Sequence, residues 1–374
     1  MNFNKFVVFI CSLSIVGIAS ADLEERVSAL EAEASISALE NNLSLGGYGE
    51  FHLNNSNGKN KMDYHRVVLY AGYQFNDWIR LNSEIELEHS KAGAGDELTI
   101  DGTEFDAEAA GYVLLEQFSV DLQVTESTAI RMGRTLAPLG IVGLRHEPPL
   151  FFGVERPNVE KYILPSTWSV DGIGLVGDLS ENISYEIYAV AGLDGSKFST
   201  SSGIRSGRIA DYPSFESPSY TGRLDYHGVG GLRVGAAFYQ GGADDKSGGT
   251  GNGLSDSEVS ITSFDAEYSV GALSLNALIA NGSHENTAVA DSDFSGSYYT
   301  AGYEIWRSGE KAIIPFVRLS EYQTHDSVDT IEGTKIGANI YLSNQFVLKA
   351  DLLTEEEGGT ETDTFSVGFG MMFQ

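Results

Sequence analysis

Five basic side chains lie close together in a chain that is otherwise strongly acidic. The whole chain has 23 basic and 53 acidic residues, a net charge of −30, yet 31 positions (131 to 161) contain Arg131, Arg134, Arg145, Arg156 and Lys161. Three carboxylates, Glu147, Glu155 and Glu160, lie among them. Bases that face water in a narrow, low-dielectric place would favour small anions. Bases that pair with the carboxylates would instead hold the segment in shape, and both interpretations are open.

Other residue types that could carry chemistry do not form a catalytic pattern. The seven histidines are scattered, without the spacing of a metal-binding helix: His52, His65, His89, His146, His227, His284 and His325. The run GVGGLRVG from Gly228 has the glycines of a phosphate-binding loop, but it is expected in a β-turn and not before a helix. The acidic group at 355–363 could bind a divalent cation, although such groups are more often solvated loop tips. We predict no enzyme, no cofactor and no metal site, while a catalytic set assembled across strands stays open.

The basic cluster falls in a segment, 137–169, that is too irregular to be a strand. It contains five of the chain's eight prolines: Pro138, Pro148, Pro149, Pro157 and Pro165. Proline fixes φ and removes a backbone donor, so this density is typical of a shaped loop. The aromatic residues Phe151, Phe152, Tyr162 and Trp168 argue against a disordered linker. We predict an ordered loop with its own apolar anchors.

Most of the remaining chain alternates between apolar and polar residues. At 78–90, for example, Ile79, Leu81, Ile85 and Leu87 share one face, and Arg80 with three glutamates occupies the other. Period-two patterning indicates β-strands. We predict sixteen, with ends uncertain by a few residues: 45–54, 62–75, 78–90, 107–123, 127–136, 170–178, 182–192, 218–227, 231–241, 257–270, 272–282, 294–306, 311–322, 333–342, 345–354 and 363–373.

The predicted connections alternate in length. Tight turns such as Asn76-Asp77 and Ser343-Asn344 alternate with long polar loops, namely 91–106, 193–217, 242–256, 283–293, 323–332 and 355–362. A soluble sandwich has no reason to sort its loops in this way, whereas an outer-membrane barrel does. The pattern predicts an all-β fold, a 16-stranded antiparallel transmembrane β-barrel over 44–374. Pro315 interrupts one strand, and Glu116 would face lipid unless a bulge shifts it.

Two segments precede the predicted barrel. Residues 1–21 have a basic residue, a short apolar run and Ala19-Ser20-Ala21, the pattern of a cleaved secretory signal peptide. The only cysteine, Cys11, lies within it, so the mature chain would have no disulfide. Residues 22–43 have an apolar seam with heptad-like spacing, which predicts a periplasmic α-helical coiled coil between protomers, with three as the expected number. The alternative is a helix that packs on the chain's own barrel or is frayed.

Several pieces of the chain resemble the trimeric outer-membrane porins, and most specifically the phosphate-selective porin O and P family. They are LLEQFSVDLQV…AIRMGRTLAPLGI at 114–141, PFVRLSEY at 315–322, LKADLL at 348–353 and the closing FSVGFGMMF. The resemblance implies sixteen strands, a homotrimer, a third long loop that folds inward and passive diffusion of small solutes. Phosphate-selective members also have an arginine ladder and a lysine cluster. The lysine cluster has no equivalent here, so phosphate selectivity is not carried over.

Counting strand faces predicts a lumen of mixed charge. The expected inward bases are Arg66, Arg80, Arg131, Arg223, Arg233, Arg318, Lys335 and Lys349. The expected inward acids are Glu84, Glu86, Glu88, Asp121, Glu186, Asp225, Asp265, Glu267, Glu304 and Asp351. The expected pore constriction consists of Arg131, Arg134, Arg145, Glu147, Glu155, Arg156 and Lys161.

The preferred function is a porin that allows small hydrophilic solutes or ions to diffuse passively through the outer membrane of a Gram-negative cell. One alternative is a substrate-selective channel for a small anion such as phosphate or a carboxylate. Another is a structural or adhesion barrel with a plugged pore. The expected partners are the lipid bilayer, lipopolysaccharide and further copies of the chain. Nucleic acid is excluded, because binding phosphates requires an excess of Lys and Arg.

Overall fold

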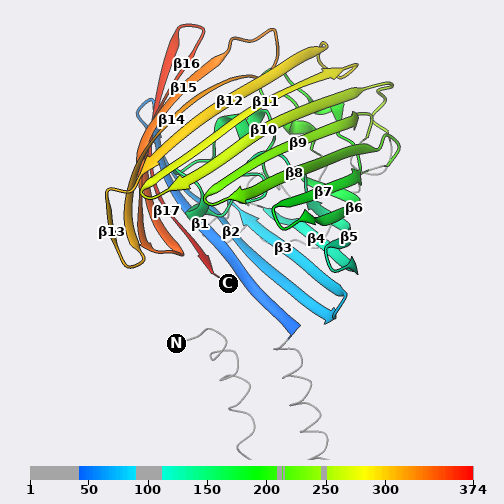
Figure 1. Cartoon of the computed structure of the whole chain (residues 1–374). Helices are drawn as coiled ribbons and strands as arrows, with labels where there is room; N and C mark the ends of the chain where they lie inside the picture. The colour runs from blue at the N-terminus through cyan, green and yellow to red at the C-terminus, as the bar shows by residue number, and fades with distance from the viewer. Residues whose placement is uncertain (1–41, 90–111, 209–212, 214, 246–250, 374) are drawn as a thin grey trace, which may run out of the picture. The chain divides into compact units, whose positions relative to one another are not determined.

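Antiparallel strands form almost all of the regular structure in the computed structural model, which describes residues 42–89, 112–208, 213, 215–245 and 251–373 (Figure 1). The predicted signal peptide and all but the last two residues of the predicted coiled coil lie outside these residues. The strands are β1 (Leu43–Ser56), β2 (Lys59–Asn76), β3 (Ile79–Glu88), β4 (Tyr112–Thr125), β5 (Thr128–Leu136), β6 (Ser169–Ser180), β7 (Ile183–Val190), β8 (Ser219–Val229), β9 (Leu232–Gly242), β10 (Glu258–Val270), β11 (Leu273–Glu285), β12 (Ser292–Tyr303), β13 (Trp306–Ser308), β14 (Lys311–Gln323), β15 (Ile331–Ser343), β16 (Phe346–Glu357) and β17 (Thr360–Phe373).

The strands close into a barrel because the first pairs with the last. Gly47 of β1 lies opposite Phe373 of β17, and the register continues to Ser56 opposite Thr364. Each strand otherwise pairs with its sequence neighbours, except that β12 and β13 both pair with β14. These two segments form one wall strand, so the barrel has sixteen strands, as predicted.

Both residues that did not fit the predicted strands are explained by irregular pairing. Pro315 of β14 lies opposite the break between β12 and β13, where Gly302 pairs with Phe316 and Trp306 with Ile313. A residue without an N–H group therefore sits where the neighbouring strand is interrupted. The β3–β4 register shifts between Glu84 and Ile85, which leaves Glu116 as an extra, inward-facing residue. A bulge re-aims a side chain in this way.

One predicted loop is wrong. Residues 355–362 were expected to form a long polar loop, but β16 and β17 extend through them to a turn at Gly358 and Gly359. Both glycines have positive φ, +56° and +79°, which a tight hairpin turn requires. The strand signal was missed because four of these residues are glutamates, which are unfavourable in most strands but tolerated on a solvated hairpin.

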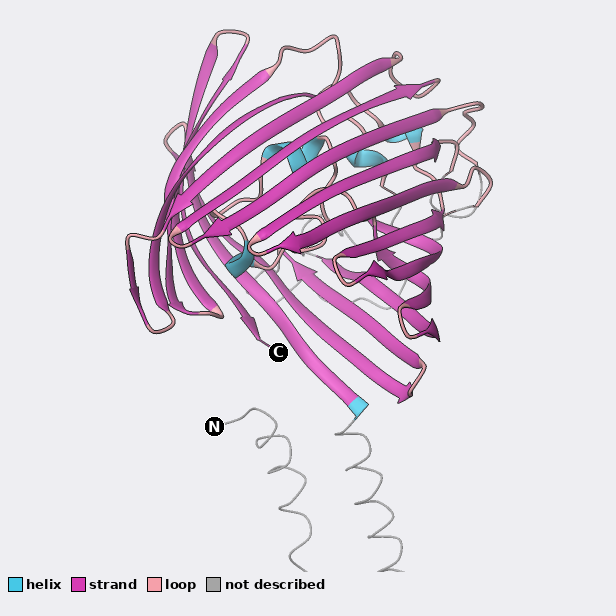
Figure 2. Ribbon diagram, in the orientation of Figure 1, coloured by secondary structure: helices cyan, strands magenta, loops and turns pink. Residues whose placement is uncertain are grey.

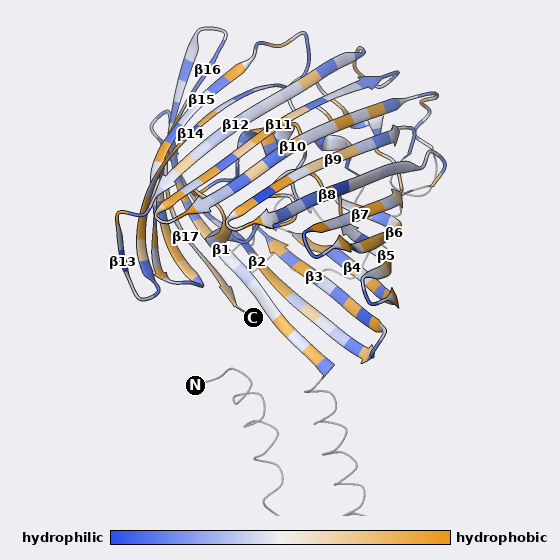
Figure 3. Ribbon diagram, viewed as in Figure 1, coloured by the Kyte–Doolittle hydropathy of each residue, from blue (hydrophilic) through white to orange (hydrophobic). Residues whose placement is uncertain are grey.

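The outer surface of the barrel is apolar along its strands. Hydrophobic and hydrophilic residues alternate along the ribbon (Figure 3). Outward side chains such as Leu69, Phe264 and Ile336 are 47%, 64% and 52% exposed. A water-soluble monomer does not expose apolar side chains all along its strands, because the area far exceeds the usual patch. None of the helices in the described part of the chain combines the length and apolar character needed to cross a membrane.

The hydrophobic core lies inside the barrel. Between β5 and β6 the chain runs inward through residues 137–168, which we call the constriction loop, and includes a 3₁₀ turn η2 (Pro148–Leu150) and a short helix α3 (Asn158–Tyr162) (Figure 2). Buried apolar residues of this loop pack on the inner wall and on the β7–β8 connection. That connection contains the 3₁₀ turns η3 (Gly195–Lys197) and η4 (Arg205–Gly207).

Candidate functional site

The constriction loop is attached to the β12 side of the barrel by a buried carboxyl group. Glu160 of α3 has no exposed surface, and it accepts hydrogen bonds from the Tyr298 hydroxyl at 2.5 Å and the Val142 N–H at 2.6 Å. Burial, with a smaller contribution from the negative charge of Asp265, raises the pKa of Glu160 to about 7. The carboxyl group is therefore protonated in mildly acidic solution, where it bonds these groups without the cost of a buried charge.

A second attachment joins the loop tip (Leu150–Glu155) to strands β14–β16. Arg318 donates to the Phe152 carbonyl at 2.9 Å, Asn339 donates to the Phe151 carbonyl at 3.0 Å, and the Val154 N–H donates to Asp351 at 2.6 Å. Two lysines complete the contact. The Lys335 Nζ lies 3.4 Å from the Glu155 carbonyl, and the Lys349 Nζ lies 3.5 Å from the centre of the Phe151 ring.

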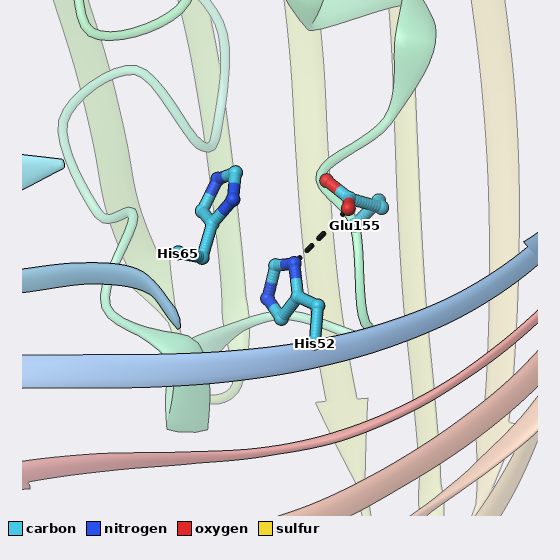
Figure 4. A group of neighbouring side chains, drawn as sticks. All are labelled: His52, His65 and Glu155. Carbon is cyan, nitrogen blue, oxygen red and sulfur yellow. Dashed lines mark hydrogen bonds and ion pairs between the residues drawn. The ribbon is translucent and has the colours of Figure 1, made fainter. Parts of the chain in front are cut away.

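A third attachment joins the loop tip to β1. Glu155 Oε1 accepts a hydrogen bond from His52 Nδ1 at 3.0 Å (Figure 4). It also accepts one from Asn54 at 3.1 Å. The His52 ring stacks on His65 of β2, with ring centres 4.4 Å apart. Burial by itself would raise the pKa of Glu155, but the His52 hydrogen bond and nearby positive charges outweigh it and hold that pKa well below its usual range. The loop thus crosses the lumen from its ends on β5 and β6 to the wall formed by β12–β17 and β1.

A cavity of about 760 Å³ remains between the constriction loop and the β1–β5 wall, and we call it the vestibule. Most of its bases come from the loop, from β5 and from the β7–β8 connection: Arg134, Arg156, Lys161, Arg205 and Arg208. Arg66 of β2 is the exception, because it lies among the acids and pairs with three of them. Its acids come mainly from the facing strands β1, β3 and β4: Glu50, Glu86, Glu88 and Glu116. Four acids and Arg66 on one wall, and five bases and Glu155 on the other, give the two walls opposite net charge, which sets up an electric field across the vestibule.

The residues predicted for the constriction are placed in different surroundings. Arg131 pairs with Asp121 at 2.7 Å, Arg134 pairs with Asp171 at 2.7 Å, and Arg145 pairs with Glu267. Glu147 accepts from Tyr70 at 3.4 Å, and Glu155 forms the attachment to β1. Lys161 and Arg156 line the vestibule. The Arg156 Nε and Nη2 atoms are buried and have no hydrogen-bond partner within the described part of the chain.

The predicted lumen residues mostly belong to ion-pair networks on the wall. Arg66 bonds Glu50, Glu86 and Glu88 at 2.8, 2.6 and 3.2 Å. A second network consists of Arg223, Arg233, Asp225, Asp265 and Glu267. Arg318 holds the loop tip, Glu84 is buried beneath the loop and Arg80 is exposed near the β2–β3 turn. Inward bases are thus largely neutralised by acids on neighbouring strands.

Sequence reasoning missed Arg205 and Arg208, which lie in the connection predicted as 193–217. Arg205 donates to the Lys161 carbonyl at 2.9 Å, and Arg208 donates to the carbonyls of Ser166 and Thr167 at 3.2 and 3.0 Å. These bonds tie the β7–β8 connection to the constriction loop. Two arginines spaced three residues apart in a polar loop were a weak signal that the connection folds back over the pore.

The protonation of Glu160 leads to a testable pH dependence. A raised pKa means that the attachment is strongest below the usual carboxyl pKa near 4.5 and weakens as pH rises through about 7. The shift corresponds to about 3 kcal/mol. When the pH is raised from 5 to 8.5, amide exchange of residues 140–164 should therefore accelerate up to roughly 100-fold more in the wild-type protein than in E160Q. Glutamine stays neutral, so the wild-type and variant rates should agree at pH 5. Hydrogen exchange measured by mass spectrometry, with E126Q as an exposed control, checks this. A constant ratio across pH would contradict it.

Comparisons with known proteins agree with the barrel architecture. No protein-family model matches the sequence. An uncharacterized protein of Aquifex aeolicus (strain VF5) is 34% identical over 223 residues, which are 58% of this chain, and the chain spans about half (48%) of that relative's length.

Solved structures extend the comparison to nearly the whole barrel. An anion-selective porin from Comamonas acidovorans has a TM-score of 0.58 at 13% identity, covering 88% of this chain and 99% of that one. Salmonella typhi OmpF, in complex with daunomycin, has a TM-score of 0.58 at 16% identity, covering 88% and 97%. A trimer form of Vibrio cholerae OmpT has a TM-score of 0.52 at 12% identity, covering 88% and 98%. The chain therefore has a porin-like fold, and these low identities show the fold alone.

Proposed function

We propose that the chain is an outer-membrane porin through which small hydrophilic solutes or ions diffuse passively. The observation that carries the proposal is a closed sixteen-stranded barrel with an apolar outer face and a charged vestibule of about 760 Å³ beside an inward loop. An apolar outer face requires lipid around the barrel. The outer membrane, with its lipopolysaccharide, is the location that matches both this architecture and the predicted signal peptide.

Planar-bilayer recording of the purified full-length chain tests this function. A diffusion pore should give stepwise conductance that increases with salt concentration in proportion to that of the bulk solution, and small neutral sugars should pass it. Sugars can be followed by the swelling of liposomes that contain the protein. A folded barrel that adds no conductance and no sugar permeability would refute the proposal.

One observation favours the alternative of a plugged barrel. Apolar residues of the constriction loop pack tightly on the inner wall, including Trp168 on Tyr239 with ring centres 4.6 Å apart. A loop held by such a core fills much of the lumen. Under this alternative the wild-type protein would be silent in the bilayer and would conduct only after the loop is released.

We also propose a homotrimer, because porin-like barrels include a solved trimer form and residues 22–43 have a heptad-like seam. The main contact is expected between barrel walls, with the coiled coil adding to it. Deleting residues 22–43 should therefore lower the temperature at which the trimer dissociates without unfolding the barrel. Light scattering in mild detergent and semi-native electrophoresis measure both. Replacing Leu30 and Leu39 by aspartate should have the same effect as the deletion, whereas a full-length chain that is entirely monomeric would refute the trimer.

A further inference from the structure

Three buried metal-binding side chains meet where the constriction loop contacts the wall. Glu84 of β3, Glu116 of β4 and His146 of the loop are 1%, 3% and 2% exposed, and their donor atoms all lie within 4.8 Å of one another. The bulge in the β3–β4 pairing turns Glu116 inward beside Glu84. The three groups come from three separate segments, two of them held in the barrel wall.

The distances suit a shared metal ion better than hydrogen bonds. His146 Nε2 lies 3.3 Å from Glu84 Oε1 and 3.9 Å from Glu116 Oε2. A hydrogen bond at 3.3 Å is long, and 3.9 Å is no hydrogen bond. Two ligands bound to one zinc ion at about 2.05 Å in tetrahedral geometry are about 3.3 Å apart. The His146–Glu84 pair already has that spacing, and the His146–Glu116 pair would reach it after a movement of about 0.6 Å.

A second observation points to a cation independently of these distances. Both carboxylate oxygens of Glu116 are buried and have no hydrogen-bond partner in the part of the chain that the structure describes. Buried polar atoms are nearly always satisfied, so two unsatisfied oxygens beside a second buried carboxylate call for either a cation or a proton shared between the carboxyl groups. A divalent ion would neutralise both carboxylates at once.

We propose that Glu84, Glu116 and His146 bind a divalent transition-metal ion, zinc being the probe that fits them best. One imidazole and two carboxylates form a nitrogen and oxygen donor set, which suits zinc or manganese. Calcium and magnesium prefer sites made of oxygen donors alone. Gln117 donates to the other oxygen of Glu84 at 2.5 Å and so orients that ligand. Glu116 lines the vestibule, so an ion can enter from there. The bound ion would fasten the loop to the β3–β4 wall.

A second group of metal-binding side chains, Asp63, His65 and His89, is the main rival. Its close contacts are already accounted for by hydrogen bonds, because both histidine Nδ1 atoms lie 3.0 and 2.9 Å from the two Asp63 oxygens. The Arg66 guanidinium also donates to His65 Nε2 at 2.6 Å, so both ring nitrogens of His65 are already engaged.

Zinc titration of the full-length barrel, stripped of metal with a chelator and held in detergent at pH 7.5, tests the proposal. Competition with a chromophoric chelator should show one zinc ion per chain. E116Q and H146Q should each bind zinc at least about 100-fold more weakly, since losing a ligand costs no less than losing a second-shell partner. H227A, a control outside both groups, and H89A, in the rival group, should stay within about threefold of wild type.

The outcomes separate the explanations. A wild-type barrel that binds no zinc overturns the proposal and leaves a proton shared between the two carboxyl groups. Binding that is lost in H89A but retained in E116Q overturns it in favour of the rival group. Heat-modifiable electrophoretic mobility shows which variants are folded, and H146Q serves if E116Q does not fold. Zinc binding does not depend on conductance, so failure of the proposed pore function would be recognised separately.

Discussion

Replacing Arg156 and Lys161 by glutamate is expected to lower the anion-to-cation permeability ratio about 15-fold. Both side chains line the vestibule, and reversing both removes four units of positive charge from it. A unit charge about 8 Å away changes the energy of an ion by about 0.5 kcal/mol in water, and salt screening reduces this to about 0.2 kcal/mol. Anions and cations respond in opposite directions, so each charge unit changes the ratio about twofold, and four change it roughly 15-fold.

The measurement is the reversal potential of single channels in a salt gradient. R131E is the matched control, because Arg131 pairs with Asp121 and does not line the vestibule. The sequence predicts that Arg131 and Arg145 also act on permeating ions, and their ion pairs make us expect smaller shifts from them. Equal shifts in R131E and in the double variant would show that the vestibule does not control selectivity. This result would also decide whether the channel is anion-selective.

The strands were predictable because their signal is local. The alternation along each segment and the turn residues between segments depend only on neighbouring positions in the sequence. All sixteen predicted strands overlap observed ones. The loop at 137–169 was also predictable, because its prolines exclude a strand. The bulge that turns Glu116 inward was not predicted itself; the sequence indicated only that Glu116 would face lipid without one. One extra residue in a strand pairing leaves no recognisable pattern in the neighbouring sequence.

The partners of the site residues were not predictable from the sequence. Glu155 meets His52 across 103 positions, Glu160 meets Tyr298 across 138, and Val154 meets Asp351 across 197. Face counting correctly placed Asp351 and Arg318 inside the barrel, where both are buried beneath the loop tip. It could not show which wall the loop would reach, because that depends on the closure of the whole barrel.

Replacing the loop tip, Leu150–Glu155, by six glycine and serine residues is expected to increase conductance several-fold. Phe151, Phe152 and Val154 are at most 9% exposed, and losing their burial removes roughly 5 kcal/mol of attachment. Glycine also adds freedom to the released loop. With its attachments to β14–β16 and β1 lost, the tip leaves that wall and widens the passage beside it, while Glu160 still holds α3 to β12. The matched control is the same replacement at 251–256, an already glycine-rich part of the β9–β10 connection.

The same replacement should also make the pore more selective for anions. The loop tip covers Arg318, Lys335 and Lys349, which are 4–5% exposed, and Asp351 is the acid among them. Exposing three bases and one acid brings two units of positive charge to the lumen surface, and the loss of Glu155 with the tip adds a third, so the anion-to-cation ratio should rise by about eightfold on the scale used above. Higher conductance without this shift would mean that the wall lysines stay covered. If the conductance does not change, the narrowest part of the pore lies away from the loop tip. If the variant conducts and the wild-type protein does not, the wild-type barrel is plugged by the loop.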